Sequence, residues 1–316
     1  MAPPQFLNTL SMNEVSLPAR MAARSAFDAF ISYALYPLLL AATLALFAIA
    51  VAHGWNLATV FAWMASARLA LLLAVEFLHP ARPEWRMTWR SFWRDLKYMA
   101  VNGGTSAALK LGLGWLALDL SRWNTGIVTG MPAVVEFLAV LLTFEFLQYW
   151  YHRLSHEGRG PVSRWLWKLH VAHHLPDKVY LLMHPVGHPL NFIASLAIVQ
   201  LPLFTLGARP ETLFLFNALM GLQGLVSHFN VDIKAGPLNY LLVGTELHRF
   251  HHSANLDEAK NFGVLTPFWD LVFGTFRYSP RQLPSALGVA EPARYPASTA
   301  IVEVLMLPFR RIREPG

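Results

Sequence analysis

The chain of 316 residues contains no cysteine. This absence excludes disulfide bonds, iron–sulfur clusters, thiolate-bound haem and cysteine nucleophiles. It also leaves histidine as the main nitrogen or sulfur ligand that the sequence can offer to a transition metal, beside weakly binding methionine. The missing disulfides do not by themselves indicate a redox compartment.

Charged side chains are also scarce. They make up 14% of the sequence, whereas hydrophobic residues make up 55% and the mean hydropathy is +0.38. Soluble globular proteins carry about 25% charged residues. We therefore expect an all-α integral membrane protein, whose length is explained by membrane helices rather than by a second globular domain. No apolar stretch followed by a small-residue cleavage site is found in the first 30 residues, so no removable signal peptide is expected.

Several apolar segments approach the length of about 20 residues that a helix needs to cross the hydrocarbon layer. They are Ile31–Ala52, Leu57–Leu78, Tyr98–Leu118, Pro132–Tyr151, Pro189–Leu206 and Glu211–Phe229. The last two form either a full hairpin or a shallow re-entrant pair, because only a short Gly207–Pro210 connection separates them. The sequence thus predicts a bundle of four to six transmembrane helices.

Lysine and arginine are unevenly distributed between the two sides of this bundle. The N-terminal segment contributes Arg20 and Arg24, and the loops after the second and fourth spans and the segment after Phe229 contain many lysines and arginines, whereas the opposite side has only Arg122 and Arg209. Positively charged loops tend to remain cytoplasmic. Both termini and a helical cap formed by residues 152–188 and 230–280 are therefore predicted in the cytoplasm, at the inner (plasma) membrane if the protein is bacterial.

Two further segments are expected at the membrane surface. In the loop Arg82–Lys97, arginines recur at helical spacing beside Trp85, Trp89 and Trp93, which is typical of a helix at the headgroup level. The net charge of +6 is thereby assigned to membrane-facing segments, and no nucleic-acid partner is expected. The tail Ser298–Arg313 is expected to be either an interfacial anchor or a frayed end.

Histidine is abundant where cysteine is missing. Eleven of the 13 histidines lie between His152 and His252, and eight of them fall into three clusters in which the imidazoles share one helical face. The clusters are His152 and His156; His170, His173 and His174; and His248, His251 and His252. A single zinc ion takes about four ligands, so this number of imidazoles favours two metal ions.

A carboxylate accompanies the first cluster. Glu145 lies seven residues before His152, within the fourth expected span and on the same helical face. Ionisable groups inside a membrane span are costly and usually functional. Glu145 is therefore a candidate for hydrogen-bonding a metal-ligating imidazole and orienting it. The alternative is a structural ion pair with Lys110 or Arg68.

The clusters occur in a fixed order with further motifs around them. These motifs are Glu145 to His156, His184-Pro185, Ser227-His228-Phe229-Asn230, Asn261-Phe262-Gly263 and Phe268 to Thr275. From Phe144 to Tyr278 the sequence resembles the membrane-bound fatty acid hydroxylase and sterol desaturase superfamily. The resemblance implies a di-iron centre, bound mostly by histidines at the cytoplasmic membrane face. The ligands it implies are His152, His156, His170, His173, His174, His184, His228, His248, His251 and His252.

Two positions depart from the family pattern. His188 follows the His184-Pro185 pair where many members have an acidic residue, so it is either a further ligand or a bystander. Asp232 stands four residues after His228, where acyl hydroxylases have another histidine, and whether its carboxylate binds metal is left open. The resemblance further implies an N-terminal membrane anchor with three spans at 1–130, a catalytic domain at 131–280 and a C-terminal tail at 281–316.

The function implied by the resemblance is hydroxylation of a C–H bond in a lipid, either an acyl chain or a sterol-like ring, with dioxygen and two iron ions. Electrons would come from a separate reductase or electron-carrier protein. A desaturase with the same metal site is the closest alternative. A zinc hydrolase would carry a carboxylate as in His-Glu-x-x-His, and a metal transporter would place ligands near mid-membrane. A non-catalytic membrane scaffold is the third class.

Overall fold

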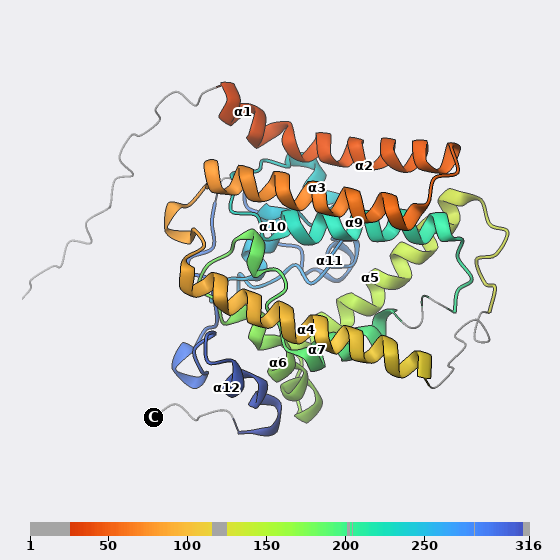
Figure 1. Ribbon diagram of the computed structural model, residues 1–316. Coiled ribbons are helices and arrows are strands. Elements are labelled where there is room, and N and C mark those ends of the chain that lie inside the picture. The colour runs from red at the N-terminus through yellow and green to blue at the C-terminus, as the bar shows by residue number, and fades with distance from the viewer. Residues whose placement is uncertain (1–25, 116–124, 201–202, 204, 281, 312–316) are drawn as a thin grey trace, which may run out of the picture.

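The computed structural model describes residues 26–115, 125–200, 203, 205–280 and 282–311 (Figure 1). These residues fold into helices joined by loops, and within them the only β-structure is an isolated bridge between Ser253 and Leu287. The predicted all-α fold is thus confirmed. The first 25 residues, on which the signal-peptide prediction depends, lie outside the described part.

Three helices of the described residues are long and apolar enough to cross a membrane. They are α2 (Leu35–Ala52), α3 (Leu57–Leu78) and α5 (Ala133–Glu157). A short helix, α1 (Ala26–Tyr33), precedes α2. The chain turns between α2 and α3 at Gly54–Asn56, where the Asn56 side chain accepts a hydrogen bond from Thr59 N and thereby caps α3. An integral membrane helix bundle is confirmed, and the three candidate spans among the described residues roughly support the four to six helices expected.

The third expected span is part of a longer helix, α4 (Trp89–Trp115). Thr88 and Ser91 start this helix with reciprocal hydrogen bonds between side chain and backbone N–H. The helix predicted within Arg82–Lys97 is thus present from Trp89 onward, as the first part of this longer helix. Only Pro83–Trp85 forms a 3-10 turn there, and the residues from Trp89 onward belong to α4. The expected end at Leu118 lies outside the described residues.

The two expected spans after the fourth differ from each other. The first becomes α7 (Pro189–Ser195) and a π-helical turn, η4 (Leu196–Gln200), too short in the described residues to cross a bilayer. The second is α9 (Pro210–Ser227), which carries Asn217 and Gln223 and packs against α2 and α3 (Figure 1). These short or polar helices support the re-entrant alternative rather than a full hairpin.

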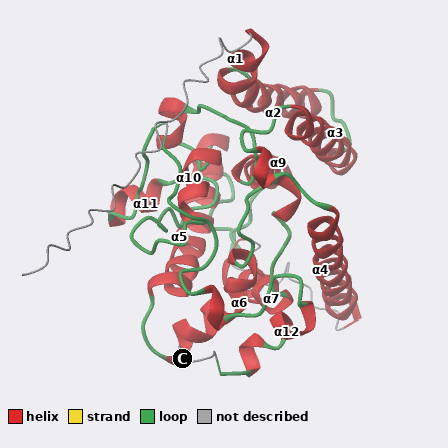
Figure 2. Ribbon diagram, turned by 90° about the vertical axis from the view of Figure 1, so that its left-hand side faces the viewer, coloured by secondary structure: helices red, strands yellow, loops and turns green. Residues whose placement is uncertain are grey.

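A helical cap formed by residues 158–188 and 228–311 surrounds one end of α5. Figure 2 shows α10 between the α2–α3–α9 layer on one side and α6, α7 and α12 on the other. The cap helices are α6 (Pro161–His174), η3 (Leu181–Met183), η5 (Gly236–Tyr240), α10 (Thr245–His251), α11 (Phe268–Phe273), η6 (Pro292–Arg294), α12 (Ile301–Leu305) and η7 (Leu307–Phe309).

The C-terminal tail is folded into this cap. Val304 and Leu307 are buried in the same apolar cluster as Val171 of α6 and Tyr98 of α4. Lys168 Nζ also donates to the carbonyl oxygen of Arg310 at 2.7 Å. Up to residue 311 the tail is therefore neither a frayed end nor a free interfacial anchor, and Arg313 lies outside the described residues.

A buried arginine links the apolar helices. Arg68 of α3 is 7% exposed and donates to the Ala218 carbonyl of α9 at 2.8 Å, to Thr43 Oγ1 of α2 at 2.6 Å and to Met64 Sδ at 2.7 Å. A charge in an apolar layer is tolerated only where partners surround it. These bonds also exclude Arg68 as the ion-pair partner of Glu145.

Replacing Thr43 by valine should therefore destabilise the bundle. Valine keeps the volume but removes the oxygen that accepts from Arg68, and a buried donor left without its partner costs about 1–3 kcal/mol. We expect a lower midpoint of thermal unfolding in detergent. The double variant Thr43→Val/Arg68→Met should recover much of the loss, because no buried charge remains. An unchanged midpoint in Thr43→Val, or a double variant less stable than the single, would contradict this role for Arg68.

Candidate metal centre

The three histidine clusters converge on one end of α5. His152 and His156 lie on the last two turns of α5, and the second cluster closes α6. The third cluster lies on α10 and its C-terminal cap, and His228 caps the end of α9. Nine imidazoles from four helices are thereby gathered into two adjacent groups.

Group one contains His152, His156, His170, His174 and His251, with one ring nitrogen of each within 4.8 Å of the others. The Nε2 atom of His170 lies 3.0 Å from the Nε2 atoms of both His152 and His174. Within the described part of the chain, the Nε2 atoms of His156 and His251 are buried without any hydrogen-bond partner. Buried polar atoms normally have one, so these nitrogens indicate a missing ligand.

Group two contains His173, His228, His248 and His252. The Nε2 atom of His228 lies at its centre, 3.1 Å from that of His173 and 3.0 Å from that of His248. An ion with metal–nitrogen bonds of about 2.0–2.1 Å holds neighbouring ligand nitrogens roughly 3.0–3.4 Å apart. The spacing of both groups therefore fits a bound transition metal.

Backbone carbonyls determine which nitrogen of three rings carries the proton. The Nδ1 atoms of His152, His173 and His251 lie 2.8, 2.8 and 3.1 Å from carbonyl oxygens. The respective acceptors are Phe262, Val186 and Lys260. A carbonyl can only accept, so Nδ1 of each ring donates and Nε2 keeps its lone pair in the neutral imidazole. These lone pairs face the two groups, as metal ligation requires.

Burial keeps the histidine rings of both groups uncharged. It lowers the pKa of His170 and His174 in group one, and of His228, His248 and His252 in group two, well below the usual range for histidine. Neighbouring imidazoles lower each pKa further. Neutral imidazole is the metal-binding form, so the apoprotein is already in the protonation state that an ion needs.

The two groups share a boundary. The rings of His174 in group one and His252 in group two stack with centroids 4.5 Å apart, and the rings of His174 and His173, the latter in group two, lie 5.5 Å apart. Two ions held by these groups would be close neighbours. The arrangement can therefore serve a reaction that needs two metals at one substrate position.

Three residues lie outside both groups: His184, which was predicted to be a ligand, and His188 and Asp232, whose role as ligands was left open. His184 lies behind group two, with its Nδ1 3.3 Å from Nδ1 of His228, and burial lowers its pKa to about 4. A Cβ at Gly224 would come within 2.9 Å of the His184 ring, so α9 needs glycine there. His188 instead caps α7 through Leu190 N and contacts the Leu305 carbonyl. Asp232 forms an ion pair with Lys234.

Glu145 was predicted to hydrogen-bond an imidazole and orient it, but its carboxylate has other partners in the structure. Its carboxylate is fully buried and accepts the backbone N–H groups of Val264, Leu265 and Thr266. These residues follow the two carbonyls that hold His152 and His251. Glu145 therefore fixes the loop that carries those carbonyls, rather than contacting a ring.

Asp270 braces the same loop from its other side. It accepts the N–H groups of Phe262 and Gly263 at 2.8 Å each, and the Thr275 hydroxyl at 2.6 Å. A Cβ at Gly263 would lie 2.3 Å from the Thr266 carbonyl oxygen, so only glycine fits. This gives a physical reason for the Asn261-Phe262-Gly263 and Phe268–Thr275 motifs, to which the sequence assigned no separate task.

Glu76 is a positioning residue that the sequence analysis missed. Near the end of α3, it accepts Leu181 N at 2.9 Å and Asn230 N at 2.7 Å. Leu181 lies three residues before His184, and Asn230 lies two residues after His228. Glu76 thus ties a membrane helix to both segments at group two. A carboxylate near the end of an apolar span, as at Glu145, was the available signal.

A cavity of about 270 Å³ opens onto group one. His156, His174 and His251 line its inner end, and Arg164, Trp167 and Tyr295 are among the residues that line the rest. Trp167 packs on His156 with ring centroids 5.0 Å apart and donates its indole N–H to the Tyr295 hydroxyl. Group one is therefore reachable by a small molecule while most of its rings stay shielded.

Comparison with known proteins identifies the family. Residues 137–275 match the model of the fatty acid hydroxylase family. The chain is 28% identical over 230 residues to an ornithine lipid hydroxylase of Rhizobium tropici. The aligned segment covers 70% of this chain and 68% of that protein. It is 25% identical over 158 residues to methylsterol monooxygenase 1-1 of Arabidopsis thaliana, covering 46% of this chain and 49% of that protein.

A human protein is also similar to part of the chain. The chain is 29% identical over 141 residues to alkylglycerol monooxygenase of Homo sapiens, which covers 44% of this chain and 30% of the relative. No solved structure matches significantly. The matched region contains all nine grouped histidines, Glu145 and Asp270. The comparisons confirm the predicted resemblance to the fatty acid hydroxylase and sterol desaturase superfamily, and with it an integral membrane oxidoreductase.

Proposed function

We propose that this protein hydroxylates a C–H bond of a membrane lipid with dioxygen, using two iron ions held in groups one and two. The observation that carries the proposal is the convergence of nine buried, neutral imidazoles on two adjacent points. The relatives support it, because their names describe oxygen insertion into an ornithine lipid, a methylsterol and an alkylglycerol. Zinc has no redox chemistry, so iron is the metal that suits this reaction.

The reaction is R–H + O2 + 2 e⁻ + 2 H⁺ → R–OH + H2O. Bound iron supplies the activation of dioxygen that this oxidation requires. The two electrons come from a separate electron-carrier protein, since the chain contains no cysteine for an iron–sulfur cluster and shows no electron-carrier module of its own. One oxygen atom enters the lipid and the other leaves as water.

The protein's own residues position and shield the site. Carbonyls of Phe262, Val186 and Lys260 hold three ligand rings in the tautomer that presents Nε2. Phe262 and Trp167 pack on His156 at ring-centroid distances of 5.5 and 5.0 Å and shield part of its ring. A dry, rigid site suits oxidation of an unactivated C–H bond, because it limits side reactions.

The location of the site suits a lipid substrate. His152 and His156 lie at the end of the apolar helix α5, and Glu76 ties group two to the end of α3. The concentration of lysine and arginine on this side supports a cytoplasmic site and cytoplasmic termini. The reacting lipid therefore enters from the bilayer, and the electron carrier approaches from the cytoplasm.

Product analysis tests the reaction. Purified protein, reconstituted with lipid extract and a reducing electron carrier, should produce lipids that contain one labelled oxygen atom from ¹⁸O2. A lipid that has lost two hydrogens without gaining oxygen would identify a desaturase. Oxygen derived from water, or hydrolysed lipid without any oxidation, would reject the proposal.

Single histidine replacements should remove one ion and the activity. His251→Ala removes a ligand of group one, and His173→Ala removes a ligand of group two. We expect each variant to insert into membranes, to bind close to half of the iron of the wild type and to form no hydroxylated lipid. Iron analysis and mass spectrometry of the lipids measure both effects.

His188→Gln is the matched control, because His188 lies close to the centre but binds Leu190 N and the Leu305 carbonyl. It should retain both ions. Full activity in either His251→Ala or His173→Ala, or loss of iron in His188→Gln, would show that the ligand set is assigned wrongly.

Glu145→Gln tests the loop that carries the carbonyls. The amide group places N–H donors against the backbone N–H groups of residues 264–266, so the loop shifts and the Phe262 and Lys260 carbonyls no longer fix His152 and His251. Loss of such outer hydrogen bonds costs roughly 10–100-fold in metal affinity. We expect iron titration to show weakened binding in group one and unchanged binding in group two. Equal weakening of both ions would indicate general unfolding instead.

A further inference from the structure

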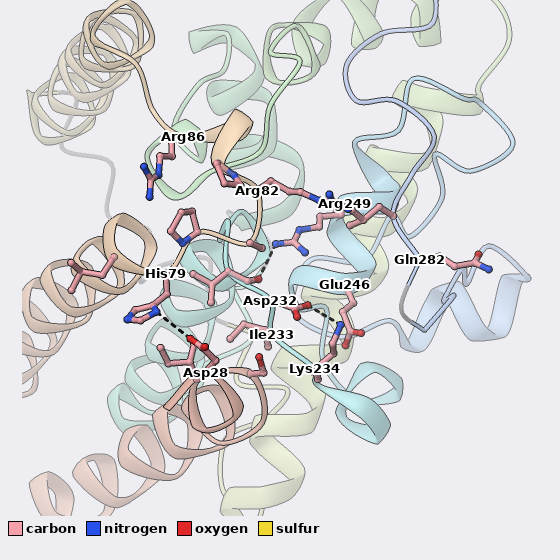
Figure 3. Close-up of a pocket in the computed structure, with 18 residues that line it drawn as sticks. Asp28, His79, Arg82, Arg86, Asp232, Ile233, Lys234, Glu246, Arg249 and Gln282 are labelled. Carbon is pink, nitrogen blue, oxygen red and sulfur yellow. Dashed lines mark hydrogen bonds and ion pairs between the residues drawn. The ribbon is translucent and has the colours of Figure 1, made fainter. Parts of the chain in front are cut away.

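A second, larger cavity is lined by Arg249 of α10 and by residues 231–234 of the segment that follows His228 (Figure 3). Its volume is about 570 Å³, and it is separate from the cavity that opens onto group one. Its walls are the end of α1, the loop after α3, the segment after His228, and α10. Three guanidinium groups line it, those of Arg82, Arg86 and Arg249, and Figure 3 shows all three on the same side of the cavity.

Arg249 is the buried member of this trio. It is 4% exposed, and its Nη2 donates to the carbonyls of Phe229 and Val231 at 2.9 Å each. Its Nε is buried without a hydrogen-bond partner among the described residues. The guanidinium also lies 5.6 Å from the centre of the Trp85 ring. A buried, charged donor without an acceptor indicates that a ligand completes the site.

Arg82 and Arg86 add exposed positive charge to the cavity. The Arg86 side chain makes no hydrogen bond or ion pair with any described residue. Arg82 forms a long ion pair with Glu84, at 4.0 Å and exposed to solvent, which contributes little.

The carboxylates at the cavity have partners of their own. Asp28 and Asp232 form ion pairs, and Glu246 accepts two N–H groups from the protein. Their partners are His79 for Asp28, Lys234 for Asp232, and Ala235 N and the Asn239 side chain for Glu246. The three guanidinium groups therefore remain available to an anion, to which a planar guanidinium binds in bidentate fashion.

The rest of the lining indicates the source of that anion. The cavity lies where α3 ends, beside Trp85, and apolar side chains from four segments line it together with the arginines. They include Ile31, Leu78, Val231, Ile233 and Leu283. An anion-binding group next to apolar walls, at the end of membrane helices, matches the headgroup region of a lipid.

We propose that this cavity binds the phosphate or carboxylate group of a membrane lipid headgroup. This proposal rests on the proposed function, and the lipid bound in the cavity is then the substrate of that reaction. Arg249 lies between His248 and His251 on α10, and it is hydrogen-bonded to the segment that follows His228. A headgroup held here is anchored to the two segments that carry group two, which fixes the distance from the headgroup to the carbon that reacts.

Lipid binding by the purified full-length protein tests the site without turnover. The probes, in non-ionic detergent, are dihexanoyl phosphatidylglycerol, the uncharged dihexanoylglycerol and inorganic phosphate. We expect phosphatidylglycerol to bind most tightly, because only it combines the anion with apolar chains. The variant Arg82→Gln/Arg86→Gln should bind it at least about tenfold more weakly, since charge-assisted hydrogen bonds are lost. Lys97→Gln/Arg159→Gln removes the same charge from exposed positions outside the cavity and should bind normally.

Several outcomes separate the parts of the proposal. Equal affinity of both double variants, or of the charged and uncharged lipids, would overturn the anion site. Phosphate binding as tight as lipid binding would overturn the assignment to a lipid. Weakened lipid binding with unchanged product formation and iron content would overturn the role as substrate anchor. Arginine-dependent binding in a protein that oxidises no lipid would support the site and remove the proposed function.

Discussion

The fold of this protein must hold nine histidine side chains so that one ring nitrogen of each is directed at the centre of group one or of group two. Neutral imidazoles packed with Nε2 atoms 3.0–3.3 Å apart repel one another wherever both atoms carry lone pairs, and burial prevents relief by protonation or by water. A cation between them converts the repulsion into bonds. Until it binds, the surrounding structure must hold the rings in place.

Two carboxylates provide much of that support, and neither touches a ring. Glu145 accepts three backbone N–H groups of residues 264–266, and Asp270 accepts two more at Phe262 and Gly263. Together these two carboxylates fix the loop so that the Phe262 carbonyl reaches His152 and the Lys260 carbonyl reaches His251. Glu76 does the same for the segments at group two. The membrane helices thus position the ligands through carboxylate–backbone bonds as well as through apolar packing.

Much of this centre could be predicted because its signals are local. Imidazoles three and four residues apart on a helix must share a face, and the structure gathers nine of the ten expected histidines into two groups, with His184 immediately behind His228. The remainder depends on contacts between distant residues. Glu145 binds residues about 120 positions away, and His188 binds the carbonyl of Leu305, so neither task could be read from neighbouring sequence.

The helix boundaries, too, could be predicted only in part. Apolar length predicted α2, α3 and most of α5, because crossing a bilayer demands length and apolarity alone. It failed at α4, where the Thr88–Ser91 cap begins the helix within the basic loop. Pro80 to Arg86 stay outside both α3 and α4, with a 3-10 turn at Pro83–Trp85, and Arg82 and Arg86 of this segment line the same cavity as Arg249. The end of α3, the segment from Pro80 to Arg86 and α10 therefore line one cavity. The same helix α10 carries His248 and His251, so one short helix links this cavity to the histidine groups.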